Sequence, residues 1–227
     1  MNLALKALII LHTESEGPGS LGEFMASKGA TVNTVRLYSG EELPRYIRDF
    51  NAVISMGGPM NVYEDNKYPF LAAEAVFLKD AIGAGMAVLG VCLGAQMIAR
   101  SCNAAVKKAP ENEIGWSKVE LTDEGRRDDL FLGVPRVFPV LQWHEDTFDL
   151  PENATLLAIA PKCPHQAFRY KNAYGIQFHI EATREMLSDW FDGTAIHDNI
   201  LITYEEMEKE ISRNAERIYT NFVALAD

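Results

Sequence analysis

The segment GVCLG at 90–94, centred on Cys92, has the residue types of a nucleophile elbow in which cysteine replaces serine. A strand-like apolar run precedes it at 87–89, and a helix-compatible run follows at 95–100. A sharp strand-to-helix turn needs small residues on both sides of the nucleophile, because larger side chains would collide there. The turn also places the thiol at a helix N-terminus, where free N–H groups favour the thiolate. The pattern indicates a nucleophilic cysteine, and the alternative is a cysteine buried as a small hydrophobe.

A second candidate group follows the apolar run at 174–178, where the chain continues as His179-Ile180-Glu181. In an extended segment residues i and i+2 face the same side, so His179 and Glu181 can point into one site. The imidazole would take the thiol proton and return it to a leaving amine, while the carboxylate would orient the ring. A histidine near a glutamate is common in structural roles, so this pair indicates a catalytic role only in combination with Cys92.

A third candidate is the glycine pair Gly57-Gly58, which ends the strand-like run at 52–54 and is followed by Pro59. Glycines there let the backbone direct an N–H group toward a developing oxyanion, and the amide of Leu93 would be a second donor. A phosphate-binding loop is the competing interpretation, but neither of the usual glycine-rich phosphate signatures is present. An ordinary turn is the remaining alternative.

The elements that must position these residues follow an alternating pattern in the first half of the chain. Strand-like runs lie at 7–11, 31–37, 52–54 and 87–91, and helix-like segments lie at 21–28 and 71–84. This alternation predicts an α/β fold with a mostly parallel sheet and helices on both faces. We expect the chemistry beyond the carboxyl ends of the strands.

The second half predicts two additions to this sheet. More polar strands at 117–121, 154–160 and 166–169 indicate a small antiparallel annex before the chain returns to the sheet at 175–178. Beyond residue 200, apolar residues recur every three or four positions, which predicts an amphipathic helix. They are Ile200, Tyr204, Met207, Ile211, Ala215, Ile218, Phe222 and Leu225. We expect one domain over 1–195 with the helix of 196–227 packed on it; a dimer or partner face is the alternative.

Composition excludes several classes of partner. The formal net charge of -11 and the absence of a Lys/Arg cluster argue against nucleic acid and membrane surfaces. Three cysteines without C-x-x-C spacing favour reduced thiols, and no apolar run is long enough to span a membrane, so we expect a soluble cytoplasmic protein. His144 with Glu145 and Asp146, or Cys163 with His165, lacks a second ligand pair, so no metal is expected.

Taken together, GGP at 57–59, GVCLGAQ at 90–96 and QFHIE at 177–181 resemble the motifs of class I glutamine amidotransferases. The chain is most similar to free-standing proteins that resemble the amidotransferase domain of GMP synthase. Further matching segments are EGPG at 16–19, YED at 63–65, EIGW at 113–116 and QWH at 142–144. The resemblance implies a flavodoxin-like fold. It also implies attack of Cys92 on the glutamine γ-amide, a γ-glutamyl thioester, release of ammonia and hydrolysis to glutamate, without metal or organic cofactor.

The resemblance also assigns roles to individual positions. Cys92, His179 and Glu181 would form the triad, Gly58 and Leu93 would supply oxyanion amides, and Gln96, Trp143, His144 and Glu145 would hold the amino-acid end of the substrate. Two positions depart from the family pattern. Ile180 replaces a usual proline but carries no reactive group, whereas Glu145 replaces a common glycine and adds bulk and negative charge beside the expected pocket.

Three functions remain open from the sequence. The first is a glutamine-hydrolysing subunit that passes ammonia to a separate ATP-dependent synthetase, because the chain carries no ATP-binding motif of its own. The second is a stand-alone γ-glutamyl peptidase or hydrolase acting on small γ-glutamyl compounds. The third is a catalytically silent binding module, against which the intact triad argues.

Overall fold

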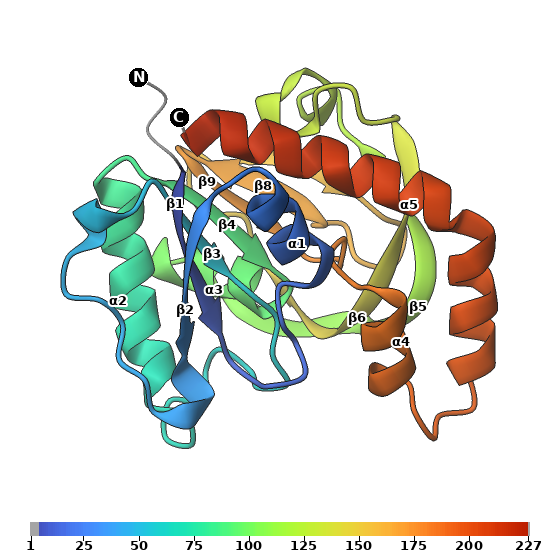
Figure 1. Ribbon diagram of the computed structural model, residues 1–227, viewed down its shortest axis with the longest axis horizontal. Helices are drawn as coiled ribbons and strands as arrows, with labels where there is room; N and C mark the ends of the chain where they lie inside the picture. The colour runs from blue at the N-terminus through green and yellow to red at the C-terminus, as the bar shows by residue number, and fades with distance from the viewer. Residues whose placement is uncertain (1–4, 227) are drawn as a thin grey trace.

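The computed structural model describes residues 5–226, and its strands form one nine-stranded sheet in the order β2-β1-β3-β4-β9-β8-β7-β5-β6 (Figure 1). The strands are β1 (Lys6–Leu11), β2 (Thr31–Arg36), β3 (Ala52–Ser55), β4 (Ala87–Val91), β5 (Val106–Leu121), β6 (Val137–Phe148), β7 (Thr155–Ile159), β8 (Ala167–Tyr170) and β9 (Ala173–Ile176). The α-helices are α1 (Gly19–Ser27), α2 (Phe70–Gly83), α3 (Leu93–Ser101), α4 (Arg184–Trp190) and α5 (His197–Ala226). Short 3-10 turns lie at Leu37–Ser39, Ile47–Asp49, Gly125–Arg127 and Asp129–Phe131.

Five adjacent strands, β2, β1, β3, β4 and β9, pair in parallel. Alternate residues of β1 face opposite sides, because side chains alternate along a strand. Leu8 and Ile10 pack in one buried cluster with α2 and α3, and Ala7 and Ile9 pack in another with α1 and α5. This confirms the predicted α/β sheet with helices on both faces, and the strand order of the parallel part is the flavodoxin-like one.

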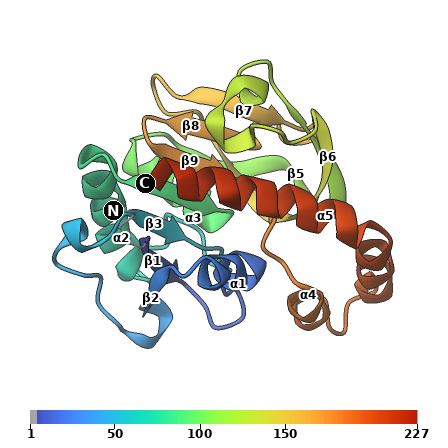
Figure 2. The ribbon, with the colours of Figure 1, turned by 45° about the horizontal axis from the view of Figure 1, so that its top comes forward.

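The antiparallel strands β8, β7, β5 and β6 extend the same sheet beyond β9. In Figure 2, β7 and β8 lie on one side of α5, and β1 to β3 lie on the other. The sequence pattern predicts no strand where β6 lies, which has 12 residues, and it predicts only 117–121 of β5, which has 16. The outer part of β5, 106–113, is polar and contains proline, so no strand pattern is visible there; pairing with β6 forms it, interrupted by an irregularity between Lys108 and Glu113.

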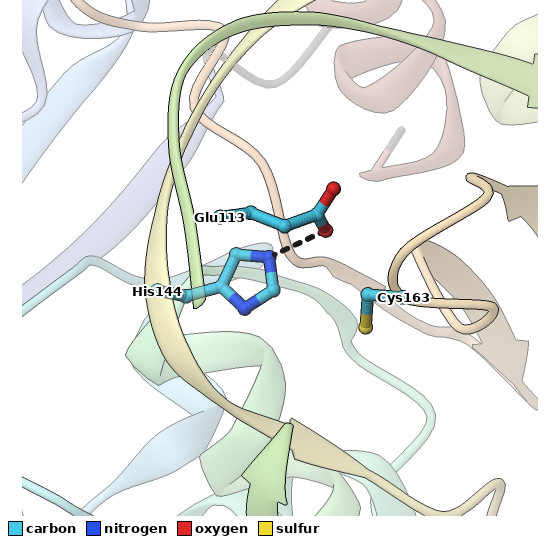
Figure 3. A group of neighbouring side chains, drawn as sticks. All are labelled: Glu113, His144 and Cys163. Carbon is cyan, nitrogen blue, oxygen red and sulfur yellow. Dashed lines mark hydrogen bonds and ion pairs between the residues drawn. The ribbon is translucent and has the colours of Figure 1, made fainter. Parts of the chain in front are cut away.

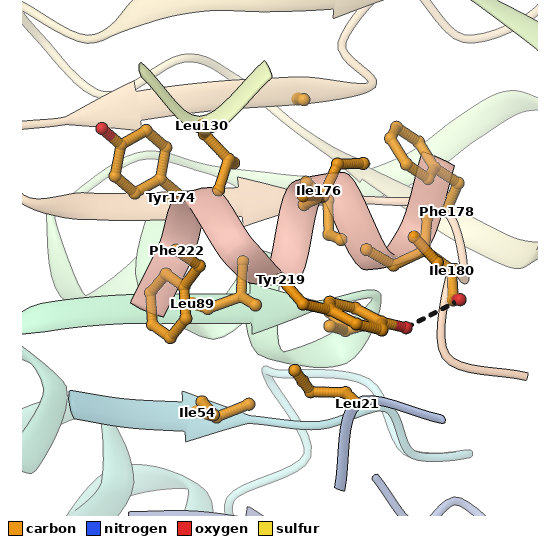
Figure 4. Packing of buried hydrophobic residues seen from close by; sticks show 14 of the residues in the cluster. Leu21, Ile54, Leu89, Leu130, Tyr174, Ile176, Phe178, Ile180, Tyr219 and Phe222 are labelled. Atoms are coloured by element: carbon orange, nitrogen blue, oxygen red, sulfur yellow. Dashed lines mark hydrogen bonds between the residues drawn. The ribbon is translucent and has the colours of Figure 1, made fainter. Parts of the chain in front are cut away.

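Helix α5 buries most of the predicted apolar stripe. Of the eight residues, Met207 and Leu225 are half-buried and the other six are buried. Tyr219 and Phe222 pack over Leu89 and Ile176 of the sheet, as Figure 4 shows. From this packing we propose that 1–195 and 196–227 form one domain; residues 1–4 and 227 lie outside the described part. Within residues 5–226, no helix combines the length and apolar character that crossing a membrane requires.

Replacing Phe222 with alanine should lower the free energy of unfolding by about 3–5 kcal/mol, because a fully buried ring is removed and a cavity remains. Glu216→Ala, on the exposed face of the same helix, should change it by less than about 0.5 kcal/mol. Urea unfolding followed by circular dichroism measures both. Equal destabilisation by the two variants would contradict the packing described for α5.

Candidate active site

Cys92 lies in the turn between β4 and α3, with backbone angles φ 52° and ψ −106°. Its N–H donates to the Ile176 carbonyl at 2.8 Å, which ties the turn to β9. The flanking glycines, Gly90 and Gly94, allow this turn to pack closely on itself and on the end of β3. A Cβ at Gly90 would lie 2.4 Å from the Gly94 carbonyl, and a Cβ at Gly94 would lie 2.0 Å from the Ser55 carbonyl oxygen. A side chain at Gly90 would therefore collide with the turn itself, and a side chain at Gly94 would push the turn away from the end of β3.

The Cys92 side chain is 6% exposed and lies among polar groups. Its Sγ lies 3.7 Å from the Trp143 carbonyl oxygen, and Nε2 of Gln177 donates to Sγ at 3.6 Å. The sulfur also lies at the N-terminus of α3, where the first N–H groups of a helix have no intrahelical acceptor. The Gln177 amide and the helix N-terminus therefore both direct N–H groups toward the sulfur.

His179 and Glu181 follow β9 and form a buried ion pair behind the thiol. The His179 N–H donates to the Leu141 carbonyl at 2.9 Å, which fixes the segment against β6. Nδ1 of His179 lies 2.7 Å from Oε1 of Glu181, and the other carboxylate oxygen accepts from the Ile180 N–H at 2.9 Å. Because Nδ1 is engaged by Glu181, Nε2 is the nitrogen left for the thiol.

The electrostatics of this group favour a charged imidazole. Burial alone would lower the pKa of His179, but the charges of Glu181 and Cys92, with hydrogen bonds to both, raise it well above its ordinary value. The ring therefore keeps its second proton close to the sulfur. An imidazolium beside a thiolate is the reactive pair of cysteine hydrolases.

Two elements that the sequence reasoning did not assign to the site cover His179. The Trp190 ring of α4 lies edge-on to the imidazole at 5.1 Å between centroids, and Trp190 Nε1 donates to the Ser15 carbonyl at 2.8 Å. Glu16, in the loop after β1, lies beside the site, and burial raises the pKa of its carboxyl. The segment EGPG at 16–19 was the available signal for this loop, although no role followed from it.

A cavity of about 470 Å³ opens next to the sulfur and collects most of the predicted residues. The predicted residues along its wall are Cys92, His179, Gly58, Leu93, Gln96, Trp143, His144 and Glu145. Glu181 lies behind His179 and does not line the cavity. The structure thus brings together residues that are up to 121 positions apart, from Gly58 to His179, at the carboxyl ends of the parallel strands.

The residues expected at the amino-acid end of a substrate have different environments. Gln96 is buried, and its Nε2 donates to the Asp146 carbonyl at 3.3 Å and to Oε1 of Gln177 at 3.1 Å. The Glu145 side chain is 64% exposed and lies 3.2 Å from Nζ of Lys108. The negative charge that Glu145 adds is therefore offset by a lysine, and much of its bulk extends into solvent.

Asp146 is a site residue that the sequence reasoning considered only as a metal ligand. Its side chain is 3% exposed and forms an ion pair with Lys108, whose Nζ lies 3.0 Å from Oδ1. Neither carboxylate oxygen has a hydrogen bond of good geometry from another residue of the described chain. Asp146 and Lys108 both line the cavity, so a buried carboxylate and an ammonium group face it together.

Glu113, His144 and Cys163 form a group whose ligand atoms lie within 4.8 Å of one another (Figure 3). Nε2 of His144 lies 3.1 Å from Glu113, and Nδ1 lies 2.9 Å from the Asp146 carbonyl oxygen. Gln166 also donates to Glu113 at 2.8 Å. Burial raises the pKa of the Cys163 thiol, which favours its protonated form over the thiolate that binds metals. We interpret the group as a hydrogen-bonded support for 143–146.

Comparison with known proteins identifies the family. The sequence profile described as "Glutamine amidotransferase class-I" matches residues 20–189. The glutamine amidotransferase-like protein YfeJ of Salmonella typhimurium is 34% identical over 185 residues, covering 80% of this chain and 77% of that protein. The glutamine-hydrolyzing GMP synthase of Thermosipho melanesiensis is 32% identical over 208 residues, covering 90% of this chain and 37% of the synthase. The chain thus spans little more than a third of the length of that synthase.

A solved structure gives the same result for the fold. The crystal structure of a glutamine amidotransferase from Thermotoga maritima matches with a TM-score of 0.89 and 31% sequence identity, covering 98% of this chain and 99% of that chain. The chain belongs to the class I glutamine amidotransferase family. The family resemblance carried by the three sequence motifs is therefore confirmed.

Proposed function

We propose that this chain hydrolyses the γ-amide of glutamine through a thioester on Cys92, releasing glutamate and ammonia. The observation that carries the proposal is that Cys92 and His179 line one cavity while Glu181 lies behind His179, so that the imidazole is held between the sulfur and the carboxylate. Family membership supports the same chemistry. Roles for the individual residues follow from their positions.

The reaction proceeds in two halves. The Cys92 thiolate attacks the γ-carbonyl carbon, and the resulting oxyanion accepts from the N–H groups of Gly58 and Leu93. His179 gives its proton to the amide nitrogen, the C–N bond breaks, and ammonia leaves. His179 then takes a proton from water, the hydroxide attacks the thioester, and the C–S bond breaks to give glutamate and free Cys92. Glu181 holds the ring in the required tautomer throughout.

The free end of glutamine is a zwitterion, and the cavity offers a matching pair of charges. We place its α-ammonium group at Asp146, whose buried oxygens have unused acceptor capacity, and its α-carboxylate near Lys108. Trp143 and His144 complete this wall of the cavity. A bound substrate would share Asp146 with Lys108 and satisfy the oxygens that lack hydrogen bonds.

Asp146→Asn should raise KM for glutamine about 10- to 100-fold, since a charge-assisted hydrogen bond to the α-ammonium is lost. The value of kcat should change much less, because this contact is the same in the ground state and the transition state. Asp149→Asn is the matched control, because Asp149 pairs with Lys107 on the exposed part of the same hairpin. Steady-state kinetics with an ammonia-coupled assay measures both variants. A fall in kcat at unchanged KM would contradict this placement.

A stand-alone γ-glutamyl hydrolase is the second candidate, favoured by the size of the cavity. The cavity extends past His179, which would protonate the leaving amine, to Ser15, Glu16, Asp189 and Trp190. Its volume lies within the range of pockets that hold drug-sized ligands, which exceeds the need of one amino acid. An amine larger than ammonia could occupy that side.

The deciding experiment compares release of glutamate from glutamine and from a panel of γ-glutamyl dipeptides by the purified chain. A higher kcat/KM for glutamine supports the amidotransferase proposal, and a higher value for the dipeptides replaces it with the hydrolase. Absence of turnover with every substrate, together with absence of a thioester on Cys92, would favour a binding module.

Use of the ammonia by a separate ATP-dependent synthetase is a further part of the proposal. The relative from Thermosipho melanesiensis is named a glutamine-hydrolyzing GMP synthase and is much longer than the aligned segment. We infer that this chain supplies ammonia to a synthetase of its own. The three unpaired cysteines fit a reducing, cytoplasmic setting.

A further inference from the structure

A buried series of three polar side chains lies behind the Gly57-Gly58 turn. Oγ of Ser55 donates to Oε1 of Glu74 at 2.7 Å, and Oε2 of Glu74 lies 2.7 Å from Nε2 of His12. The other ring nitrogen of His12, Nδ1, lies 3.1 Å from the Gly57 carbonyl oxygen. Each of the three side chains belongs to a residue that is at most 1% exposed. The series therefore links β3 and α2 to the turn beside Cys92, away from bulk water.

The hydrogen-bond partners of the two ring nitrogens determine how many hydrogens the His12 ring carries. An ionised Glu74 and the Gly57 carbonyl can only accept, and a neutral imidazole has one N–H for the two of them. An imidazolium donates to both. Burial lowers the pKa of His12, but the charge and hydrogen bond of Glu74, the Gly57 carbonyl and the charge of Glu16 together raise it. The charged ring thus holds Glu74 and Gly57 at the same time.

The groups around His12 come from several elements. Glu74 and the Phe70 ring belong to α2, with the ring centroid of Phe70 6.2 Å from that of His12, and Glu16 belongs to the loop after β1. The turn itself packs against His12, because a Cβ at Gly58 would lie 2.8 Å from the His12 Cβ. A side chain at that position would force His12 and the turn apart.

The Gly57 carbonyl and the Gly58 N–H belong to one peptide unit. The unit is trans, and in a planar trans peptide the C=O and N–H bonds point in opposite directions. A donor that holds the carbonyl on one side therefore fixes the N–H on the other side. Gly58 lines the cavity with Cys92, and its N–H has no hydrogen-bond partner within residues 5–226.

We propose that His12, Glu74 and Ser55 are positioning residues that keep the Gly58 N–H turned toward Cys92, so that the oxyanion hole is formed before any partner binds. The inference rests on the proposed function, because the N–H matters for catalysis only where an oxyanion develops. Without the hold of His12, a glycine pair can rotate its peptide freely. The rotated peptide presents a carbonyl to the oxyanion and removes one donor.

The test uses a double variant, a conservative variant and a control variant of the chain. In the double variant His12→Leu with Glu74→Met, the hydrogen bond to Gly57 is removed and no unpaired buried charge remains. Its kcat for glutamine should fall about 10²- to 10³-fold, as for loss of one oxyanion donor, while KM stays within about 3-fold because the ground state is unaffected. Alkylation of Cys92 by iodoacetamide should keep its rate, since that reaction forms no oxyanion.

The conservative variant Glu74→Gln, which retains His12, should keep most of the wild-type kcat. A glutamine at 74 can accept from Ser55 and donate to Nε2 of a neutral His12, whose Nδ1–H then still donates to Gly57. Asp128→Asn is the control for general loss of a buried carboxylate, because Asp128 bonds Leu130 and Arg169 outside the site. If the control lowers kcat as much as the double variant, or if the double variant keeps its kcat, the proposal is wrong.

Crystal structures separate this inference from the proposed function. The Gly57 carbonyl should point to His12 in the wild type and should be turned into the cavity in the double variant. If the wild type turns over no γ-glutamyl substrate, the proposed function fails, yet the carbonyl orientation still decides whether the three residues hold the turn. An unchanged orientation in the double variant would overturn the inference.

Discussion

Replacing Cys92 with alanine should lower kcat for glutamine by about four to six orders of magnitude, since the atom that forms the thioester is lost. The fold should persist, because alanine fits the 6% exposed position of the turn without new contacts. KM should change little if glutamine is held mainly by the far wall of the cavity. Ammonia release under substrate saturation measures the loss, and mass spectrometry of the wild type during turnover should detect a γ-glutamyl adduct on Cys92.

Cys163→Ala is the matched control, since Cys163 is a second buried thiol whose hydrogen-bond partners are Thr147 and the His165 carbonyl. It should retain most of the activity. An adduct on Cys163, or full activity in Cys92→Ala, would contradict the assignment of the nucleophile.

Glu181→Gln should lower kcat about 10³- to 10⁴-fold, because the neutral amide no longer fixes the tautomer of His179 or stabilises the imidazolium. The Glu181 charge is the largest of the effects that raise the pKa of His179 against burial. Without it the pKa falls, so the imidazolium that protonates the leaving amine is lost at lower pH. The alkaline limb of kcat/KM should therefore move to lower pH.

A pH series from 5 to 10 with wild type and Glu181→Gln measures this shift. Glu185→Gln provides the comparison, because Glu185 is an exposed carboxylate in the first turn of α4 and lies outside the cavity. It should leave the profile in place. A Glu181→Gln profile that keeps the wild-type alkaline limb would show that Glu181 does not control the proton on His179.

Each part of the site that was predicted from the sequence is defined by residues within one short contiguous segment. Cys92 between two glycines, the pair Gly57-Gly58, and His179 two residues from Glu181 each carry a local geometric requirement. The parallel sheet was predictable for a similar reason, since its buried strands are continuous apolar runs. Strand β6 and the outer part of β5 were not predictable, because polar residues there form strands only through pairing with each other.

The remaining site residues depend on contacts between distant segments. Asp146 and Lys108 meet only through the pairing of β5 with β6. His12 and Glu74 are 62 positions apart and show their relation only once β1 and α2 pack together. No periodicity or spacing in the sequence marks such pairs, because each residue alone is compatible with an ordinary exposed position.

The hydroxyl of Tyr219 on α5 donates at 2.8 Å to the carbonyl oxygen of Ile180, the residue between His179 and Glu181. The last helix therefore contacts the segment that carries His179 and Glu181, and Figure 4 shows the contact. In practical terms, residue 195 is a poor place to shorten the chain or to attach another protein. We therefore expect the shortest active form of the chain to extend at least through Phe222, which anchors the helix turn that carries Tyr219. Any fusion that preserves activity must leave that turn free to pack.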